Sequence, residues 1–213
     1  FFAESATTVK MGGAEVAIRQ ATAYPNDGKI RINLDPKKPA AFALRLRIPT
    51  WAGKQFVPGK LYQYANAGPA TWTLKVNGKP VEMKVEKGFT VIERTWKRGD
   101  QVELNLPMPV RLNTCHPKVE ANHDRVALTR GPFVLCAEGV DNGGVTERYF
   151  FDQLPKVTGA SVKTRSIESG SFIQTTVPAR ALTAAGGAKS LPLVLTPYYA
   201  WNNRGPSSMT VWF

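Results

Sequence analysis

The sequence predicts an all-β protein built from two consecutive antiparallel β-sandwiches of the jelly-roll or immunoglobulin-like kind. Three observations lead to this prediction. Apolar and polar residues alternate with a period of two, turn residues recur between the alternating runs, and the 213 residues include 18 glycines and 16 prolines. No stretch longer than about two helical turns has the spacing of an amphipathic helix. Short strands joined by tight turns are therefore expected throughout.

The first half of the chain contains the clearest alternation. The run "AFALRLRIP" (41–49) has apolar side chains on one face and arginines on the other. In "TWTLKVNGKPVEMKV" (71–85), Asn77-Gly78 separates two alternating runs and predicts a hairpin, because both residues tolerate a positive φ. After this turn, Val81, Met83 and Val85 are expected to point inward.

Two further strands complete the first half, and a proline-rich break follows them. The run "FTVIERTW" is followed by the turn 97–100 and by "QVELNLP". Pro107-Met108-Pro109 ends this strand, because proline cannot donate a hydrogen bond to a sheet. We therefore divide the chain into a first domain, 1–109, and a second domain, 110–213.

Alternating runs resume after the break and define the second domain. They are "RVALTRGPFVLCAE", "GASVKTRSI", "SFIQTTVPA", "LPLVLTPYYAW" and "SMTVWF". Flexible stretches, "GVDNGGV" and "LTAAGGAKS", lie between them. This spacing is typical of a β-sandwich.

The chain is basic, with a net charge of +12. Its lysines and arginines are spread along the chain, and in "ALRLRIP" and "VEMKVEKG" they occupy alternate positions, which indicates solvated sheet faces; contact with an acidic partner is the alternative. No nucleic-acid-binding module is recognisable, so no nucleic acid partner is expected. No apolar run reaches the roughly 18 residues of a membrane helix, so no membrane span is expected.

The stretch "CHPKVEANHDRVALTRGPFVLCAE" holds both cysteines and both histidines. Cys136 lies in an apolar run, where burial would raise its pKa and leave the thiol inert. Cys115 and His116 are adjacent, so on a strand they point to opposite faces. The spacing does not fit a zinc site. We predict a packed strand with no catalytic residue and no metal ligand, and leave open whether the two cysteines are bridged.

The acidic residues do not suggest a catalytic pair either. Glycoside hydrolysis needs two carboxyl groups at a fixed distance in a cleft. Glu82, Glu86, Glu93 and Glu103 all fall on outward strand positions among basic residues. The "DNGG" stretch that begins at Asp141 is expected to form an Asx turn.

Aromatic residues near the end of the chain are the candidate contact site. Tyr198, Tyr199, Trp201 and Arg204 lie together in "TPYYAWNNRG". On a strand, Tyr199 and Trp201 would share one face. These residues are predicted to form an interface or to contact sugar, with packing in the core as the alternative.

Several segments together resemble the C-terminal half of glycoside hydrolase family 127, the β-L-arabinofuranosidase-like family, of which family 146 is a close relative. They are "QATAYPNDGKIRINLDPKKPAAFALRLRIPTWA", "KRGDQVELNLPMPVRL", "NHDRVALTRGPFVLCAEGVDN" and "LTPYYAWNNRGPSSMTVWF". Two departures occur: Asn26 stands where the family's Tyr-Pro-Trp-Asp-Gly turn has tryptophan, and "RGPFVLCAE" differs in part from Arg-Gly-Pro-Leu-Val-Tyr-Cys.

The resemblance implies a division of labour. In that family an (α/α)6 barrel carries a zinc-bound cysteine nucleophile and a glutamate acid/base for a retaining hydrolysis, and two β-sandwiches follow and pack against it. None of those positions has a counterpart among these 213 residues. The resemblance therefore implies that zinc and the chemistry belong to the catalytic barrel, not to Cys115 or Cys136.

The leading hypothesis is an accessory region of a secreted or periplasmic bacterial glycosidase that acts on arabinose-containing plant polysaccharide. Its partners would be its own catalytic barrel, whose substrate cleft it would border, and a second copy in a homodimer. Because the chain begins at Phe1, an upstream segment is expected. If the sandwiches brace a barrel, one face should expose apolar side chains. A stand-alone carbohydrate-binding module and a polyanion binder are the alternatives.

Overall fold

The computed structural model describes residues 2–65, 68, 72–82, 84–152, 160–167 and 170–213. In these residues the regular structure consists of strands and of single-turn 3₁₀-helices, so the all-β prediction is confirmed. None of the helices found there is long and apolar enough to span a membrane. The chain forms two compact units, Phe1–Gly53 with Pro69–Met108, and Lys54–Gly68 with Pro109–Phe213.

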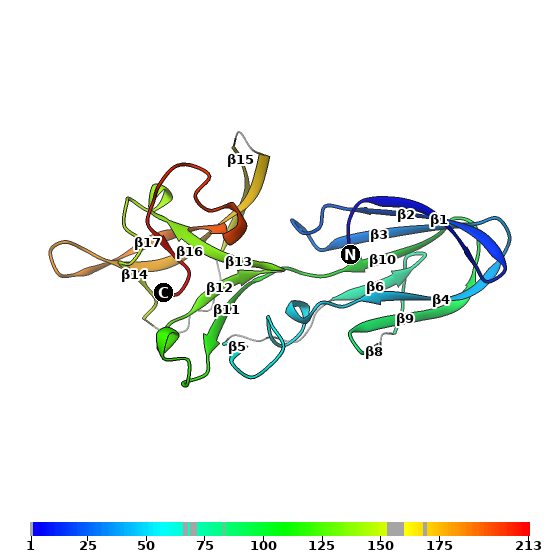
Figure 1. Ribbon diagram of the computed structural model, residues 1–213, viewed down its shortest axis with the longest axis horizontal. Coiled ribbons are helices and arrows are strands. Elements are labelled where there is room, and N and C mark those ends of the chain that lie inside the picture. Colours follow the sequence, from blue (N-terminus) through cyan, green and yellow to red (C-terminus); the bar gives the residue numbers. More distant parts are fainter. Residues whose placement is uncertain (1, 66–67, 69–71, 83, 153–159, 168–169) are drawn as a thin grey trace. The chain divides into compact units, whose positions relative to one another are not determined.

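The first unit contains two antiparallel sheets, both visible in Figure 1. The larger sheet has the order β1-β2-β3-β10-β6-β7, and the smaller has the order β4-β9-β8. Their strands are β1 (Ser5–Met11), β2 (Ala14–Thr22), β3 (Lys29–Pro36), β4 (Ala40–Arg47), β6 (Thr73–Val76), β7 (Lys79–Pro80), β8 (Val85–Glu86), β9 (Phe89–Trp96) and β10 (Asp100–Asn105). A single-turn helix, η1 (Thr50–Ala52), follows β4.

Side chains alternate between the two faces of these sheets as the sequence predicts. In β3 and β10, Ile30, Ile32 and Leu104 are buried, whereas the residues between them face outward. The smaller sheet contributes Leu46 and Trp96 to the buried apolar residues. Burial of alternate apolar side chains is the main favourable contribution to folding in such a unit.

The predicted Asn77-Gly78 hairpin is confirmed. Val76 pairs with Lys79 across a two-residue loop, and Asn77 and Gly78 have φ values of 51° and 75°. The expectation for Val85 is wrong, because its side chain is 43% exposed. Val85 belongs to a two-residue strand, β8, which lies at the edge of the smaller sheet as far as the described residues show. Met83 lies outside the described residues.

Asp100 links this hairpin to the turn that precedes β10. Its carboxylate accepts hydrogen bonds from the side chain of Asn77 and from the backbone N–H of Lys97, both at 2.8 Å. The guanidinium of Arg94 lies 3.8 Å away. Burial alone would raise the pKa of Asp100, but these hydrogen bonds and the nearby positive charges outweigh it, so the pKa lies below its ordinary value.

The 24–28 turn packs closely against the end of β10. Leu106 donates its backbone N–H to the carbonyl of Gly28 at 2.9 Å. A Cβ atom on Gly28 would lie 1.8 Å from the carbonyl oxygen of Leu106. Glycine is therefore required here by a close approach of two backbone segments. Tyr24-Pro25 in the same turn is a cis peptide.

The second unit has one connected antiparallel sheet of order β14-β16-β17-β13-β12-β11-β5, with β15 paired to β16 and β18 paired to β13. Its strands are β5 (Tyr62–Tyr64), β11 (Val110–Cys115), β12 (Ala127–Arg130), β13 (Phe133–Glu138), β14 (Tyr149–Phe150), β15 (Ser161–Ile167), β16 (Gly170–Leu182), β17 (Ala188–Pro197) and β18 (Met209–Thr210). Its single-turn helices are η2 (Glu120–Asn122), η3 (Gly139–Asp141) and η4 (Tyr198–Ala200).

Both halves of this sheet contribute to a single core. Leu112 and Leu128 from one half lie in the same apolar cluster as Val177, Leu193 and Leu195 from the other. The segment 54–68 belongs to this unit although it lies far from it in sequence, because β5 pairs with β11. Strand pairing thus assigns this segment to the second core.

Candidate interaction site

The predicted contact residues lie at the end of β17, where three aromatic side chains form an exposed group that we call the aromatic patch. Tyr198 is 47% exposed, Tyr199 60% and Trp201 37%. Tyr198 and Tyr199 are in η4, and Trp201 follows it directly. Aromatic side chains this accessible can make contacts outside the chain.

The strand geometry expected for these residues is wrong. Pro197 ends the strand, and the backbone then turns through η4. As a result, the rings of Tyr198 and Trp201 lie 6.3 Å apart, while the ring of Tyr199 lies 5.4 Å from that of Phe133. The patch therefore pairs residues three positions apart, which a period of two does not predict.

Arg204, which the sequence places in the same candidate contact site, is largely buried, unlike the three aromatic residues. Its side chain is 11% exposed, and its guanidinium donates to the carboxylates of Glu138 and Asp141, with 2.6 Å to Oδ2 of Asp141. Burial disfavours the charge on Arg204, but the hydrogen bonds and charges of the two carboxylates outweigh this and raise the pKa of the guanidinium.

Glu138, Asp141, Arg165 and Arg204 form what we call the buried ion cluster. The carboxylates of Glu138 and Asp141 are 1% and 7% exposed, and Arg165 binds Asp141 at 2.8 Å. The backbone N–H of Asn202 also donates to Glu138 at 2.9 Å. The cluster therefore attaches the loop after the aromatic patch to the end of β13, which holds the patch in place.

Sequence reasoning did not find this cluster. The carboxylate of Asp141 binds two arginines rather than capping the expected Asx turn. The amide of Asn142 instead donates to the carbonyls of Glu138 and Val194, at 2.8 and 2.9 Å. The available signal was Glu138 itself, because a charged residue that ends the apolar run "FVLCAE" requires a partner when buried.

The predicted burial of Cys136 is confirmed, and the question of a bridge is settled because both cysteines are free. Cys136 is fully buried, and burial raises the pKa of its thiol to about 12. Cys115 donates to the carbonyl of Asn122, with 3.1 Å from Sγ to O. Nδ1 of His123 lies 3.0 Å from Oδ2 of Asp124. Among the described residues, no hydrogen bond joins either cysteine to an imidazole.

The carboxylates predicted to face outward do so. Glu82, Glu86 and Glu93 are exposed, and Glu103 is partly exposed. Glu86 and Glu103 have basic neighbours, Lys84 at 3.0 Å and Arg31 at 3.5 Å. Within the part of the chain that the structure describes, no group of three or more His, Cys, Asp or Glu side chains is placed to hold a metal ion.

Comparisons with known proteins agree on one family. Residues 1–108 match the model of the beta-L-arabinofuranosidase GH127 middle domain, and residues 110–213 match that of the glycoside hydrolase family 127 C-terminal domain. The chain is 29% identical over 216 residues to a non-reducing end beta-L-arabinofuranosidase of Bifidobacterium longum, an alignment that covers 92% of this chain and 30% of that protein.

Solved structures give the same result. A GH127 beta-arabinofuranosidase has a TM-score of 0.90 and 35% identity, with 100% of this chain and 34% of that chain covered. A GH127 beta-L-arabinofuranosidase from Geobacillus stearothermophilus T6 has a TM-score of 0.83 and 31% identity, with 100% and 32% covered. The chain thus spans about a third of the length of these relatives.

Proposed function

This chain belongs to glycoside hydrolase family 127, whose middle and C-terminal domains it comprises, and we propose that it is the non-catalytic accessory region of a β-L-arabinofuranosidase-like enzyme. In this proposal a catalytic barrel carries the nucleophile, the acid/base and the zinc. The two sandwiches brace that barrel and border its substrate cleft. The chain spans about a third of its relatives, which leaves room for such a domain.

The observation that carries the proposal is the aromatic patch. Three large rings are exposed within four residues, outside the cluster of buried residues that forms the apolar core of the second unit. Tyrosine and tryptophan are enriched at protein interfaces and dominate their binding energy. The buried ion cluster anchors the adjacent loop, so the rings are presented in a fixed arrangement and need little ordering when a partner binds.

The test is to measure binding of this chain to the catalytic domain of its parent enzyme, produced as a separate chain. Calorimetry should show association, and the double variant Tyr199→Ala/Trp201→Ala should weaken it by about thirtyfold or more, as expected for loss of about 2 kcal/mol. Leu182→Ala is the matched control, because Leu182 is a similarly exposed apolar residue of the same unit. Equal affinity of all three proteins would contradict the role of the patch.

The same exposed rings favour a second candidate, a carbohydrate-binding module that stacks sugars on the rings of the aromatic patch. This candidate predicts that the chain by itself binds arabinan oligosaccharides and that Tyr199→Ala reduces the affinity. Calorimetry that detects no heat with arabinan, arabinogalactan or pectin fragments would exclude it.

A further inference from the structure

The larger sheet of the first unit carries a groove on its outward face, away from the apolar core. The groove has a volume of about 490 Å³ and is lined by residues of β2, β3, β6 and β10 and of the turn between β2 and β3. This volume lies in the range of small-ligand sites. Ala21 and Ala23 line it beside much longer side chains, and this difference in size creates the hollow.

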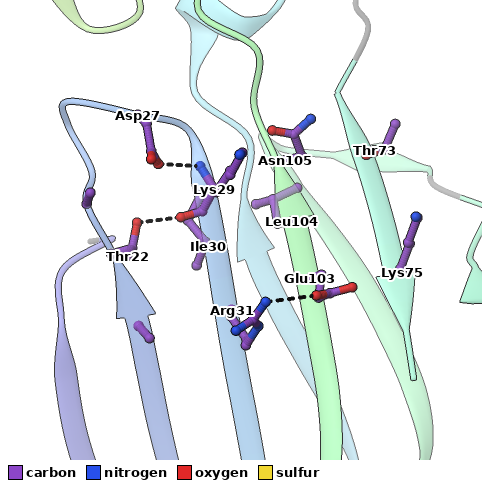
Figure 2. A pocket seen from close by; sticks show the side chains of 12 residues that line it. Thr22, Asp27, Lys29, Ile30, Arg31, Thr73, Lys75, Glu103, Leu104 and Asn105 are labelled. Atoms are coloured by element: carbon purple, nitrogen blue, oxygen red, sulfur yellow. Dashed lines mark hydrogen bonds and ion pairs between the residues drawn. The ribbon is translucent and has the colours of Figure 1, made fainter. Parts of the chain in front are cut away.

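Strand register arranges the polar side chains of the groove in two rows. Arg31, Glu103 and Lys75 are direct partners across β3, β10 and β6. Lys29, Asn105 and Thr73 form the next row in the same register. Figure 2 shows these side chains on the three neighbouring strands, with Arg31 and Glu103 in contact. Adjacent strands are about 4.8 Å apart, so each row spans about 10 Å.

The groove carries more positive charge than its own residues neutralise. Three cations line it, namely Lys29, Arg31 and Lys75. Of its two carboxylates, Asp27 already accepts the backbone N–H of Lys29 at 2.9 Å, and Glu103 lies 3.5 Å from Arg31. Among the described residues, neither lysine ammonium has an ion-pair partner within 4.0 Å.

The mixture of groups narrows the class of ligand. Lysine and arginine bind carboxylates, and arginine does so through two parallel hydrogen bonds. The side chains of Asn105, Thr73 and Glu103 can donate to or accept from hydroxyl groups. The carboxylate of Glu103, between Arg31 and Lys75, would repel a densely charged polyphosphate but can accept hydrogen bonds from hydroxyl groups. No aromatic residue of the described ranges lines the groove, so stacking of an uncharged sugar is not favoured.

We propose that this groove binds an acidic oligosaccharide, a sugar chain whose uronic acid carboxylates meet Arg31 and the two lysines while its hydroxyls meet Glu103, Asn105 and Thr73. The proposal rests on the function proposed above, since it assumes a role in glycan breakdown. It concerns a different unit from the aromatic patch. Loss of sugar binding and loss of association with the catalytic domain can therefore be observed independently.

The experiment is calorimetric titration of this chain with trigalacturonate, with its fully methyl-esterified form and with tripolyphosphate. Binding of trigalacturonate should weaken by about tenfold or more in Arg31→Gln/Lys75→Gln, because two charge-assisted contacts are lost. The matched control is Lys37→Gln/Lys84→Gln, which removes the same charge from two exposed lysines of this unit that do not line the groove. This control should bind trigalacturonate as the unaltered chain does.

Methyl esterification removes the carboxylate charge and should also weaken binding by about tenfold. No binding of trigalacturonate at millimolar concentration would overturn the proposal. Equal weakening by the groove variant and the control variant would overturn it as well, since that result indicates attraction by overall charge. Tripolyphosphate that binds as tightly as trigalacturonate would overturn the assignment to a sugar.

Discussion

Replacing Arg204 with methionine tests the buried ion cluster most directly. The change leaves the carboxylate of Glu138, which is 1% exposed, without its ion-pair partner, and leaves Asp141 with Arg165 alone. Removing one member of a buried ion pair costs about 3–5 kcal/mol, because the remaining charge is neither paired nor solvated. For a chain of about this size, each kcal/mol lowers Tm by roughly 2–4 °C, so a decrease of about 6–20 °C is expected.

The assay is urea and thermal unfolding followed by circular dichroism. Arg180→Met is the matched control, because Arg180 forms a 2.7 Å ion pair with Asp152 in which both side chains are more than 40% exposed. Such a surface pair contributes only about 0–1 kcal/mol. The double variant Glu138→Gln/Arg204→Met should be more stable than the sum of its single variants predicts, by about 0.5–3 kcal/mol, because both charges are removed together.

Two results would refute this reasoning. One is a stability of Arg204→Met within about 1 kcal/mol of the unaltered chain, which would place the carboxylates in contact with water. The other is equal destabilisation by the Arg204 and Arg180 variants, which would remove the role assigned to burial.

Three further predictions concern the rest of the chain. In the folded protein, iodoacetamide should modify Cys115 well before Cys136, because burial raises the pKa of the Cys136 thiol to about 12; equal rates measured by mass spectrometry would contradict this. The pKa of Asp100 in the folded protein lies below its ordinary value of 3.8, so in acid the unfolded chain binds more protons than the folded chain. The stability that Asp100 contributes is therefore present above pH 3.8 and is lost as the pH falls below 3.8. Asp100→Asn should therefore lower the free energy of unfolding at neutral pH, and that free energy should then fall less steeply in acid than it does in the unaltered chain. Urea unfolding at several pH values measures this, and an unchanged acid dependence would contradict it. Gly28→Ala should reduce Tm far more than Gly78→Ala, because a Cβ on Gly28 would lie 1.8 Å from a backbone oxygen. A Cβ on Gly78 would have no atom within 4 Å, so only the φ of 75° is strained there. Similar Tm values for the two variants would contradict this.

Much of the fold was predictable because local patterns determine it. Alternation of apolar and polar residues with a period of two indicates which side chains share a face of a strand. Ile30, Ile32 and Leu104 are buried as this pattern predicts. The Asn77-Gly78 hairpin was predictable because a two-residue turn with positive φ values favours these residues in any fold. Val85 was mispredicted because alternation does not state whether a strand lies at an edge.

The candidate site was predictable only in part. A group of aromatic residues near position 200 can be read from the sequence, but Pro197 and η4 decide which rings lie together. Two contacts that hold the site depend on tertiary structure, since Arg204 meets Glu138 across 66 positions and Asp141 across 63.

The sequence by itself determined the all-β class, the inward and outward faces of most strands and the family to which the chain belongs, because these depend on residue type and short-range order. The tertiary structure alone decided that 54–68 joins the second core, that Arg204 lies in a buried ion cluster, and that Arg31, Glu103 and Lys75 align across three strands. The physical reason is that sheet pairing brings together residues from distant parts of the chain, and alternation within one strand carries no information about which strands will be neighbours.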